Sequence, residues 1–321
     1  MRKLPAVLAA LSLSAVTLTG CAVTTVGGDT CVRASFDDDV SGIVTVTGSL
    51  GSAPNVSMHT PVRVSESSFT DLIDGDGVPL TADTQPAAIE LALYSGETGD
   101  LVISSPFDGD LTRLSNIDYW AGQIPGLVDA LRCAAEGTRT LVAISPEDLG
   151  EPARQGLGLG AGDSVIAVVD VLKTYLPHAQ GTLQFNAGRG LPSVVRAPDG
   201  RPGVIIPDTD PPTELVTQVL IKGEGEPVTG DDTFRVHYTG LTWADSEVFD
   251  SSWDTAPAQF SLEGLITGVS TALEGQTVGS QVLVVVPPEL GYGDVDQGSI
   301  PAGSTLVFVF DIVGIDAPPA G

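Results

Sequence analysis

The sequence repeats itself, and this internal repeat is the feature that most constrains its fold. Four short blocks of the first half recur, in the same order, in the second half. The blocks begin at Leu72, Ile124, Ser145 and Gly162, and their counterparts begin at Leu220, Ile266, Pro287 and Gly303. Four matched blocks in one order predict two copies of a single domain.

Each copy is expected to be an antiparallel sheet wrapped around one short helix, an α+β fold. In the second copy, Phe234, Val236 and Tyr238 alternate with polar neighbours, which is the period of a half-buried strand. Similar strands are predicted near Leu306 to Ile312 and Val282 to Val286. The segment between them, from Ile266 to Leu273, is long enough for only two helical turns.

The N-terminal residues predict export and a lipid anchor. Arg2 and Lys3 precede an apolar run, and Leu18-Thr19-Gly20-Cys21 resembles the bacterial lipobox. We expect residues 1–20 to be a lipoprotein signal peptide and Cys21 to carry the lipid. The alternative is an ordinary signal peptide with a chance cysteine. The predicted location is therefore outside the cytoplasm, on the bacterial cell membrane.

The domain boundaries follow from the repeat and from composition. We expect a tether at residues 21–30, a first domain at 31–175, a linker at 176–190 and a second domain at 191–321. Cys31 and Cys133 are predicted to form a disulfide, because thiols outside the cytoplasm pair readily. The alternative for Cys133 is a buried free thiol on a short helix.

The charge balance excludes several classes of partner. Lys and Arg number 14 against 41 Asp and Glu, which gives a net charge of −27. Such a surface repels nucleic acid and anionic lipid headgroups. No second apolar run of about 18 residues follows the signal peptide, so the lipid is the only membrane anchor expected. The histidines, His59, His178 and His237, lie far apart, and neither a metal site nor a cofactor is predicted.

One tyrosine is held on a turn near the end of the chain. The β-branched run at Val284 to Val286 meets Pro287 and Pro288, which cannot continue an inner strand. Tyr292 follows, between two glycines and within apolar sequence. A tyrosine in such surroundings usually lines a cavity and directs its hydroxyl at a partner.

The second copy resembles the FKBP-type peptidyl-prolyl isomerase domain. The segments that carry the resemblance are Val236 to Gly240, Val248 to Ser252, Pro288 to Gly293 and Ile300 to Phe308. The resemblance covers about Leu215 to Ile315 and extends to the first copy only through the repeat. It implies two FKBP-like domains and isomerisation of Xaa-Pro bonds in exported, proline-containing polypeptides.

The resemblance also implies roles for individual residues. The expected catalytic residues are Tyr238, Phe249, Asp250, Tyr292 and Phe308. The expected substrate-binding residues are Phe260, Leu265, Ile266, Val269 and Ile300. Val269 stands where the family often has tryptophan, so binding of macrolide inhibitors should be weak. Trp243 and Trp253 are expected on loops beside the pocket.

The first copy is predicted to have lost this pocket. Ala167 stands in place of Phe308, and the segment Leu101 to Ser105 lacks both the phenylalanine and the acid of its counterpart. Tyr94 is the nearest candidate for a match to Tyr238. The glycine-rich stretch at 156–162 precedes a strand rather than a helix, so it predicts a flexible loop and not a phosphate cradle.

Two hypotheses of different class remain. The chain is either an anchored isomerase that assists folding of exported proteins at the outer face of the membrane, or a non-catalytic binding lipoprotein on an isomerase-like scaffold. The retained aromatic and acidic residues of the second copy favour the isomerase.

Overall fold

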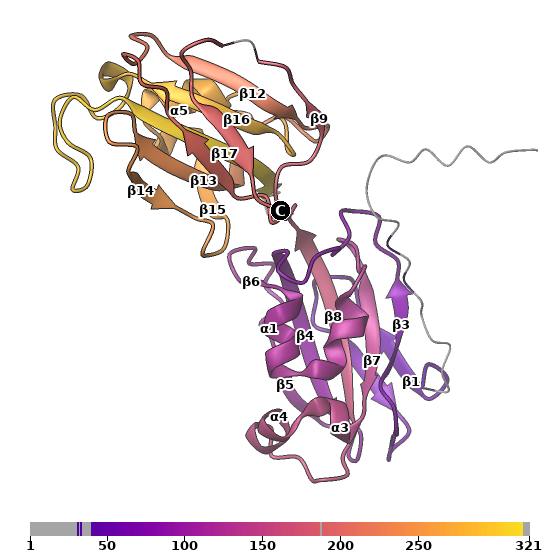
Figure 1. The fold of residues 1–321 in the computed structure, drawn as a ribbon. Coiled ribbons are helices and arrows are strands. Elements are labelled where there is room, and N and C mark those ends of the chain that lie inside the picture. The colour runs from indigo at the N-terminus through magenta and orange to yellow at the C-terminus, as the bar shows by residue number, and fades with distance from the viewer. Residues whose placement is uncertain (1–30, 32, 34–39, 187, 317–321) are drawn as a thin grey trace, which may run out of the picture. The chain divides into compact units, whose positions relative to one another are not determined.

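The computed structural model describes residues 31, 33, 40–186 and 188–316, and Figure 1 shows their strands and helices. We call residues 40–174 the N-terminal repeat and residues 175–316 the C-terminal repeat. The N-terminal sheet has the order β3-β7-β8-β4-β5, with β6 paired to β4. Its strands are β3 (Ser68–Ile73), β4 (Ala87–Ser95), β5 (Leu101–Ser104), β6 (Leu114–Ser115), β7 (Arg139–Ile144) and β8 (Val165–Thr174).

The C-terminal sheet has the order β14-β13-β17-β16-β12-β9, with β15 paired to β13. Its strands are β9 (Thr182–Leu183), β12 (Val216–Lys222), β13 (Thr233–Thr242), β14 (Val248–Ser251), β15 (Ala258–Ser261), β16 (Gln281–Val286) and β17 (Leu306–Asp316). All strand pairs in both sheets are antiparallel.

The two sheets share one topology, down to their irregularities. The register shifts between Ala88 and Ile89 where β4 pairs with β8, and between Arg235 and Val236 where β13 pairs with β17. It shifts again after Leu93 where β4 pairs with β5, and after Gly240 where β13 pairs with β14. Matching bulges fix the alignment of the two repeats residue by residue.

Both faces of the C-terminal sheet are apolar, because side chains alternate along each strand. Along β17, Leu306, Phe308 and Phe310 belong to one buried cluster, whereas Val307 and Val309 belong to another. Two layers therefore have to cover the sheet: the helix α5 (Thr267–Leu273), and a hairpin of β10 (Ser193–Arg196) and β11 (Pro202–Ile205). In the N-terminal repeat, a hairpin of β1 (Val44–Thr47) and β2 (Asn55–Met58) has the same role.

The helix α5 packs closely on β16 because Gly268 has no side chain. An added Cβ at Gly268 would lie 2.5 Å from Val286 Cγ1, well inside van der Waals contact. The observed helix, Thr267–Leu273, begins one residue after the start of the predicted helix at Ile266 to Leu273.

The N-terminal repeat departs from the prediction of one short helix. It contains α1 (Ile117–Gln123), η1 (Pro125–Leu127), α2 (Val128–Leu131), α3 (Pro146–Leu149) and α4 (Glu151–Gly156). Asn116 caps α1 by accepting from Tyr119 N, and Ser145 caps α3 by accepting from Asp148 N. The expectation was wrong because α1 and α4 lie between the matched sequence blocks, where the repeat gave no guidance.

The segment predicted as a linker packs on the C-terminal sheet along much of its length. Tyr175, the last residue of the predicted first domain, is fully buried, and its hydroxyl donates to Asp316 Oδ1 at 2.5 Å. Leu176 N donates to Val313 O, Gln180 N donates to Gly279 O, and β9 pairs with β12. For this reason we count the C-terminal repeat from Tyr175.

The first described residue is tied to the N-terminal repeat. Cys31 and Cys133 form a disulfide with a Cα–Cα distance of 5.5 Å. Cys21 and the rest of residues 1–30 lie outside the described residues. None of the helices in the described part of the chain is both long and apolar enough to cross a bilayer.

Candidate active site

Aromatic rings gather on the α5-covered face of the C-terminal sheet. We call Tyr238, Phe249, Phe260, Phe308 and Phe310 the aromatic site. The Phe249 and Phe308 centroids lie 5.6 Å apart edge to face, those of Phe308 and Phe310 lie 5.4 Å apart and stacked, and those of Tyr238 and Phe260 lie 5.5 Å apart. Phe308 and Phe310 are buried, whereas the other three rings are half-buried. The site thus has a buried base and an apolar rim that reaches solvent.

Gly240 makes this packing possible. It pairs with Phe308 on β17 and with Asp250 on β14. An added Cβ would lie 2.7 Å from Phe249 Cζ and 2.9 Å from Phe308 Cε1. Both distances are shorter than real contacts allow, so any side chain at this position would displace a ring. Gly240 ends one of the segments that carry the family resemblance, but no role was predicted for it. Its signal in the sequence is a glycine inside a strand, which often marks a close approach.

A carboxylate is fixed at the edge of the aromatic site. The Tyr238 hydroxyl donates to Asp250 Oδ2, and the Asp250 side chain is exposed. Burial raises the pKa of Tyr238, and the hydrogen bond and charge of Asp250 raise it further. The hydroxyl therefore keeps its proton at neutral pH and holds the carboxylate beside the rings.

Ser252 clamps the strands that carry these two residues. Tyr238 N donates to Ser252 Oγ at 3.0 Å, and Ser252 N donates to Tyr238 O at 3.1 Å. In the N-terminal repeat, Leu91 and Ser105 make the same pair of hydrogen bonds at 2.9 and 2.8 Å. This positioning role of Ser252 was not predicted, although a serine ends the matched segment in both copies.

The other predicted residues lie around the aromatic site. Tyr292 is 38 % exposed, on the turn after η3 (Pro288–Leu290). Ile266 is the N-cap of α5, and its N–H has no hydrogen-bond acceptor among the described residues. Leu265 packs half-buried against the same core, and Val269 and Ile300 are buried in it. Eight of the ten predicted site residues thus belong to one apolar cluster of the C-terminal repeat, and Asp250 is hydrogen-bonded to that cluster through Tyr238.

The two tryptophans lie elsewhere, so their predicted place beside the pocket was wrong. Trp243 is buried on the opposite face of the sheet with Leu283 and Val285. Trp253 stacks on His237 at 4.5 Å, and His237 faces away from its strand neighbour Tyr238. Burial lowers the pKa of His237 to about 4.

The N-terminal repeat replaces the aromatic site with aliphatic side chains. The matched registers place Leu93 at the position of Gly240 and Ala167 at that of Phe308. They also place Val102 at the position of Phe249, and Ile103 at that of Asp250. Leu93 and Ala167 are fully buried, so Leu93 stands where the C-terminal repeat leaves room for two rings.

Tyr94 does not match Tyr238, and that expectation was wrong. The bulged ladder aligns Leu91 with Tyr238 and Tyr94 with Leu241. An odd shift in register moves a side chain to the other face of a sheet. Accordingly, Tyr94 is buried under the β1–β2 hairpin, where its hydroxyl donates to Pro54 O at 3.1 Å and burial raises its pKa.

Helix α4 and the chain after it cover the corresponding rim of the N-terminal repeat. Ala153, Leu157 and Leu159 pack against the N-terminal core, together with Trp120 of α1. In the C-terminal repeat the same stretch is an exposed turn at residues 294–299. The glycine-rich stretch predicted as a flexible loop therefore begins at the end of α4 and is held by two leucines.

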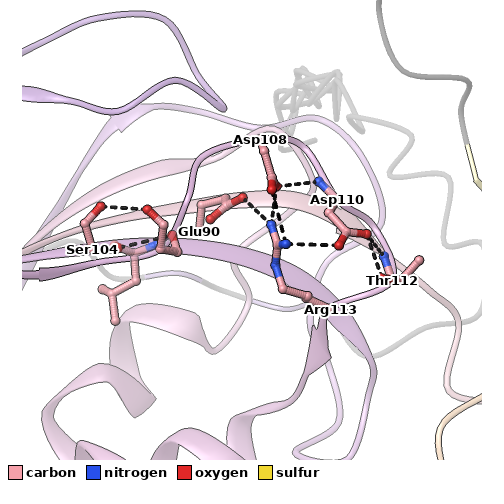
Figure 2. Close-up of polar contacts among 8 residues, drawn as sticks. Glu90, Ser104, Asp108, Asp110, Thr112 and Arg113 are labelled. Atoms are coloured by element: carbon pink, nitrogen blue, oxygen red, sulfur yellow. Dashed lines mark hydrogen bonds and ion pairs between the residues drawn. The ribbon is translucent and has the colours of Figure 1, made fainter.

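The turn after β5 in the N-terminal repeat is closed by ion pairs, as Figure 2 shows. Arg113 contacts Asp108, Asp110 at 3.0 Å and Glu90 at 3.4 Å. The Arg113 guanidinium lowers the pKa of Asp108, mainly through their hydrogen bond.

Glu90 occupies the position of His237, so the two repeats hold different polar groups at this buried position.

Sequence comparisons with known proteins point to one family. A family model described as FKBP-type peptidyl-prolyl cis-trans isomerase matches residues 224–313. A probable FK506-binding protein of Corynebacterium glutamicum is 37% identical over 114 residues, which span 35% of this chain and 97% of that protein. The FKBP-type peptidyl-prolyl cis-trans isomerase FkpA of Escherichia coli K12 is 40% identical over 109 residues, or 34% of this chain and 39% of FkpA. A crystal structure of Escherichia coli FkpA aligns with 41% of this chain and 55% of that chain, at 32% identity and a TM-score of 0.32.

Proposed function

The chain belongs to the family of FKBP-type peptidyl-prolyl cis-trans isomerases, and we propose that its C-terminal repeat catalyses this reaction on exported polypeptides. The observation that carries the proposal is the aromatic site with Asp250 held at its edge. The N-terminal repeat has the same topology and replaces every one of these groups.

The reaction needs no covalent step. An Xaa-Pro bond rotates slowly because twisting destroys amide resonance, at a cost of about 18–20 kcal/mol. A site that binds the twisted amide better than either planar form lowers this barrier. An apolar enclosure also removes the water that hydrogen-bonds to the planar amide and stabilises it.

Each part of the site has a role in this mechanism. The rings of Tyr238, Phe249 and Phe308 surround the proline ring, with Phe260, Leu265, Val269 and Ile300 completing the apolar surface. The Tyr292 hydroxyl and the free Ile266 N–H donate to substrate carbonyls. Asp250, fixed by Tyr238, acts electrostatically on the amide as it twists. Because Val269 is small, the floor is deep, and macrolides should bind weakly.

We assign no catalysis to the N-terminal repeat. Leu93 fills its base, and Ala153, Leu157 and Leu159 cover its rim. No acidic side chain stands at the position of Asp250, where Ile103 is exposed. This repeat serves as a spacer or as a surface for unfolded clients.

We place the reaction at the outer face of the bacterial membrane, with a lipid on Cys21 as anchor. The lipobox-like sequence before Cys21 and the net charge of −27 support this location. Mass spectrometry of membrane-fraction protein should find a lipid-modified N-terminus at Cys21. An unmodified N-terminus at another residue would remove the anchor from the proposal.

The test of the proposed function is a proline-peptide isomerisation assay on the full chain and two matched variants. Asp250→Ala should lower kcat/KM about tenfold to hundredfold, because an interaction with a charged group contributes about 1.5–3 kcal/mol. Ile103→Ala changes the matched position of the N-terminal repeat and should leave kcat/KM unchanged. If Asp250→Ala kept full activity, the role given to this carboxylate would be wrong. Absence of activity in the wild-type chain would favour the non-catalytic binding lipoprotein instead.

A further inference from the structure

Residues 224–316 of the C-terminal repeat, which carry the aromatic site, expose charged groups of one sign only. Residues 224–316 contain fifteen aspartates and glutamates, against one arginine, Arg235, and one histidine, His237. Arg235 is 5% exposed and is paired with Asp316. His237 is 7% exposed, and its lowered pKa keeps it neutral near pH 7. This stretch, all of which the structure describes, therefore presents no positive group to solvent.

The carboxylates lie on each segment that borders the aromatic site. Glu263 lies in η2 (Leu262–Gly264), directly before the predicted substrate-binding residues of the α5 N-cap. Glu289 lies in η3, and Asp294 and Asp296 lie on the turn that follows Tyr292. All four side chains are exposed. No ion pair involves any of them within the described residues.

The turn after Tyr292 is braced by hydrogen bonds between its two arms. Asp296 Oδ1 accepts a hydrogen bond from Ala302 N at 2.7 Å, and Gly303 N donates to Gly293 O at 2.8 Å. These bonds tie both arms of the turn together. Asp296 is consequently held on this turn, and neither Asp294 nor Asp296 forms an ion pair among the described residues.

A substrate residue next to the bound proline lies at the rim of the proposed site, on which these carboxylate-bearing segments border. Neighbouring Cα atoms are about 3.8 Å apart, so a lysine or arginine beside the proline can reach the rim with its long side chain. A surface of one sign also raises the local concentration of oppositely charged ligands. Resting on the proposed function, we infer that the site prefers polypeptides with a basic residue adjacent to the proline, and that Asp294 and Asp296 are its main specificity-determining residues.

Exposed positively charged side chains are distributed unevenly along the chain. The N-terminal repeat carries exposed arginines, among them Arg63 and Arg132, and both form ion pairs. In the C-terminal repeat, Arg189 and Arg196 are also exposed, but both precede residues 224–316, which carry the aromatic site. A role in solubility alone would predict no difference between substrates, and this separates the two explanations experimentally.

The test uses the full chain and three peptides that differ only before the proline, with lysine, leucine or glutamate. At low ionic strength we expect kcat/KM for the lysine peptide to exceed that for the glutamate peptide about five- to tenfold, since exposed ion pairs are individually weak. The ratio should fall towards one in about 0.5 M salt, where the screening length is only a few ångströms.

Variants then identify which carboxylates cause the preference for the lysine peptide. The double variant D294N/D296N keeps the hydrogen-bond acceptor of Asp296 and should lower the lysine-to-glutamate ratio at least threefold. Glu274→Gln, at the opposite end of α5, is the matched control and should leave the ratio unchanged. Equal kcat/KM for all three peptides, or an unchanged ratio in D294N/D296N, would overturn the inference while the proposed function stands. Absence of exchange with every peptide would overturn the proposed function and the inference together.

Discussion

At position 240 of the C-terminal sheet, glycine leaves room for two phenylalanine rings, and at the matched position of the N-terminal sheet, Leu93 fills the space. The replacement of Phe308 by Ala167 fits this exchange, because the small alanine leaves volume for the leucine that pairs with it. The exchange of glycine for leucine at this buried position, together with the substitutions around it, thus distinguishes an open aromatic site from a closed core.

The first prediction concerns this position. Gly240→Leu should abolish isomerase activity, since its side chain must displace Phe249 or Phe308. Overpacking should also lower the free energy of unfolding by about 1–3 kcal/mol. Peptide exchange and urea unfolding measure the two effects. As the control, Leu93→Ala should cost about 2–5 kcal/mol of stability without changing kcat/KM. Retained activity in Gly240→Leu would show that Gly240 does not keep the site open.

The second prediction concerns His237 and pH. Its pKa is about 4 in the folded chain because burial disfavours the charged ring, and about 6.5 when unfolded. The unfolded chain therefore binds the proton first as pH falls, and stability is lost between pH 6.5 and about 4, by up to about 3 kcal/mol. His237→Gln should flatten this part of the stability profile in urea titrations. An identical slope in the variant and the wild type would contradict the assignment.

At the scale of the elements, one buried polar pair takes different forms in the two repeats. Arg139 on β7 forms two 2.6 Å contacts with Asp170 on β8, and its guanidinium also donates to carbonyls of the β1–β2 turn, Gly48 among them. At the matched positions, Gln281 donates to Asp311 at 2.7 Å. Burial without a cation in contact raises the pKa of Asp311. The arginine therefore fastens the hairpin layer to the N-terminal sheet.

The third prediction follows from this pair. Arg139→Gln gives the N-terminal repeat the arrangement of the C-terminal one, but leaves the hairpin carbonyls without their donor. Removing one partner of a buried pair typically costs about 3–5 kcal/mol. Thermal unfolding should show a lower Tm, and peptide exchange at 25 °C should be unchanged. A Tm equal to that of the wild type would mean that the pair contributes little net stability.

The strands and α5 could be predicted from sequence because their side chains alternate between two faces or recur in both copies. Asp250, Tyr292 and the aromatic rings do not recur in the first copy and were predicted instead from the segments of the second copy that carry the family motifs. The helices α1 and α4 could not be predicted, since they lie where the copies diverge. The register of Tyr94 depended on a bulge, and the packing at Gly240 depended on contacts between distant strands, neither of which a linear pattern records.

At the scale of the whole molecule, two sheets of one topology carry different surfaces. One repeat keeps the aromatic site and gathers unpaired carboxylates around it, whereas the other closes its base and rim with leucines. The central claim is that isomerase activity belongs to the C-terminal repeat alone. The segment from Tyr175 to Gln184 packs on the C-terminal sheet, so a fragment that tests this claim has to include it.

The most direct measurement is the rate of cis/trans exchange of a proline peptide in the presence of residues 175–321, or of residues 31–174, each checked for folding by circular dichroism. We predict that residues 175–321 accelerate exchange with the kcat/KM of the full chain, and that residues 31–174 leave the uncatalysed rate unchanged. Acceleration by residues 31–174, or a folded but inactive 175–321, would contradict the account.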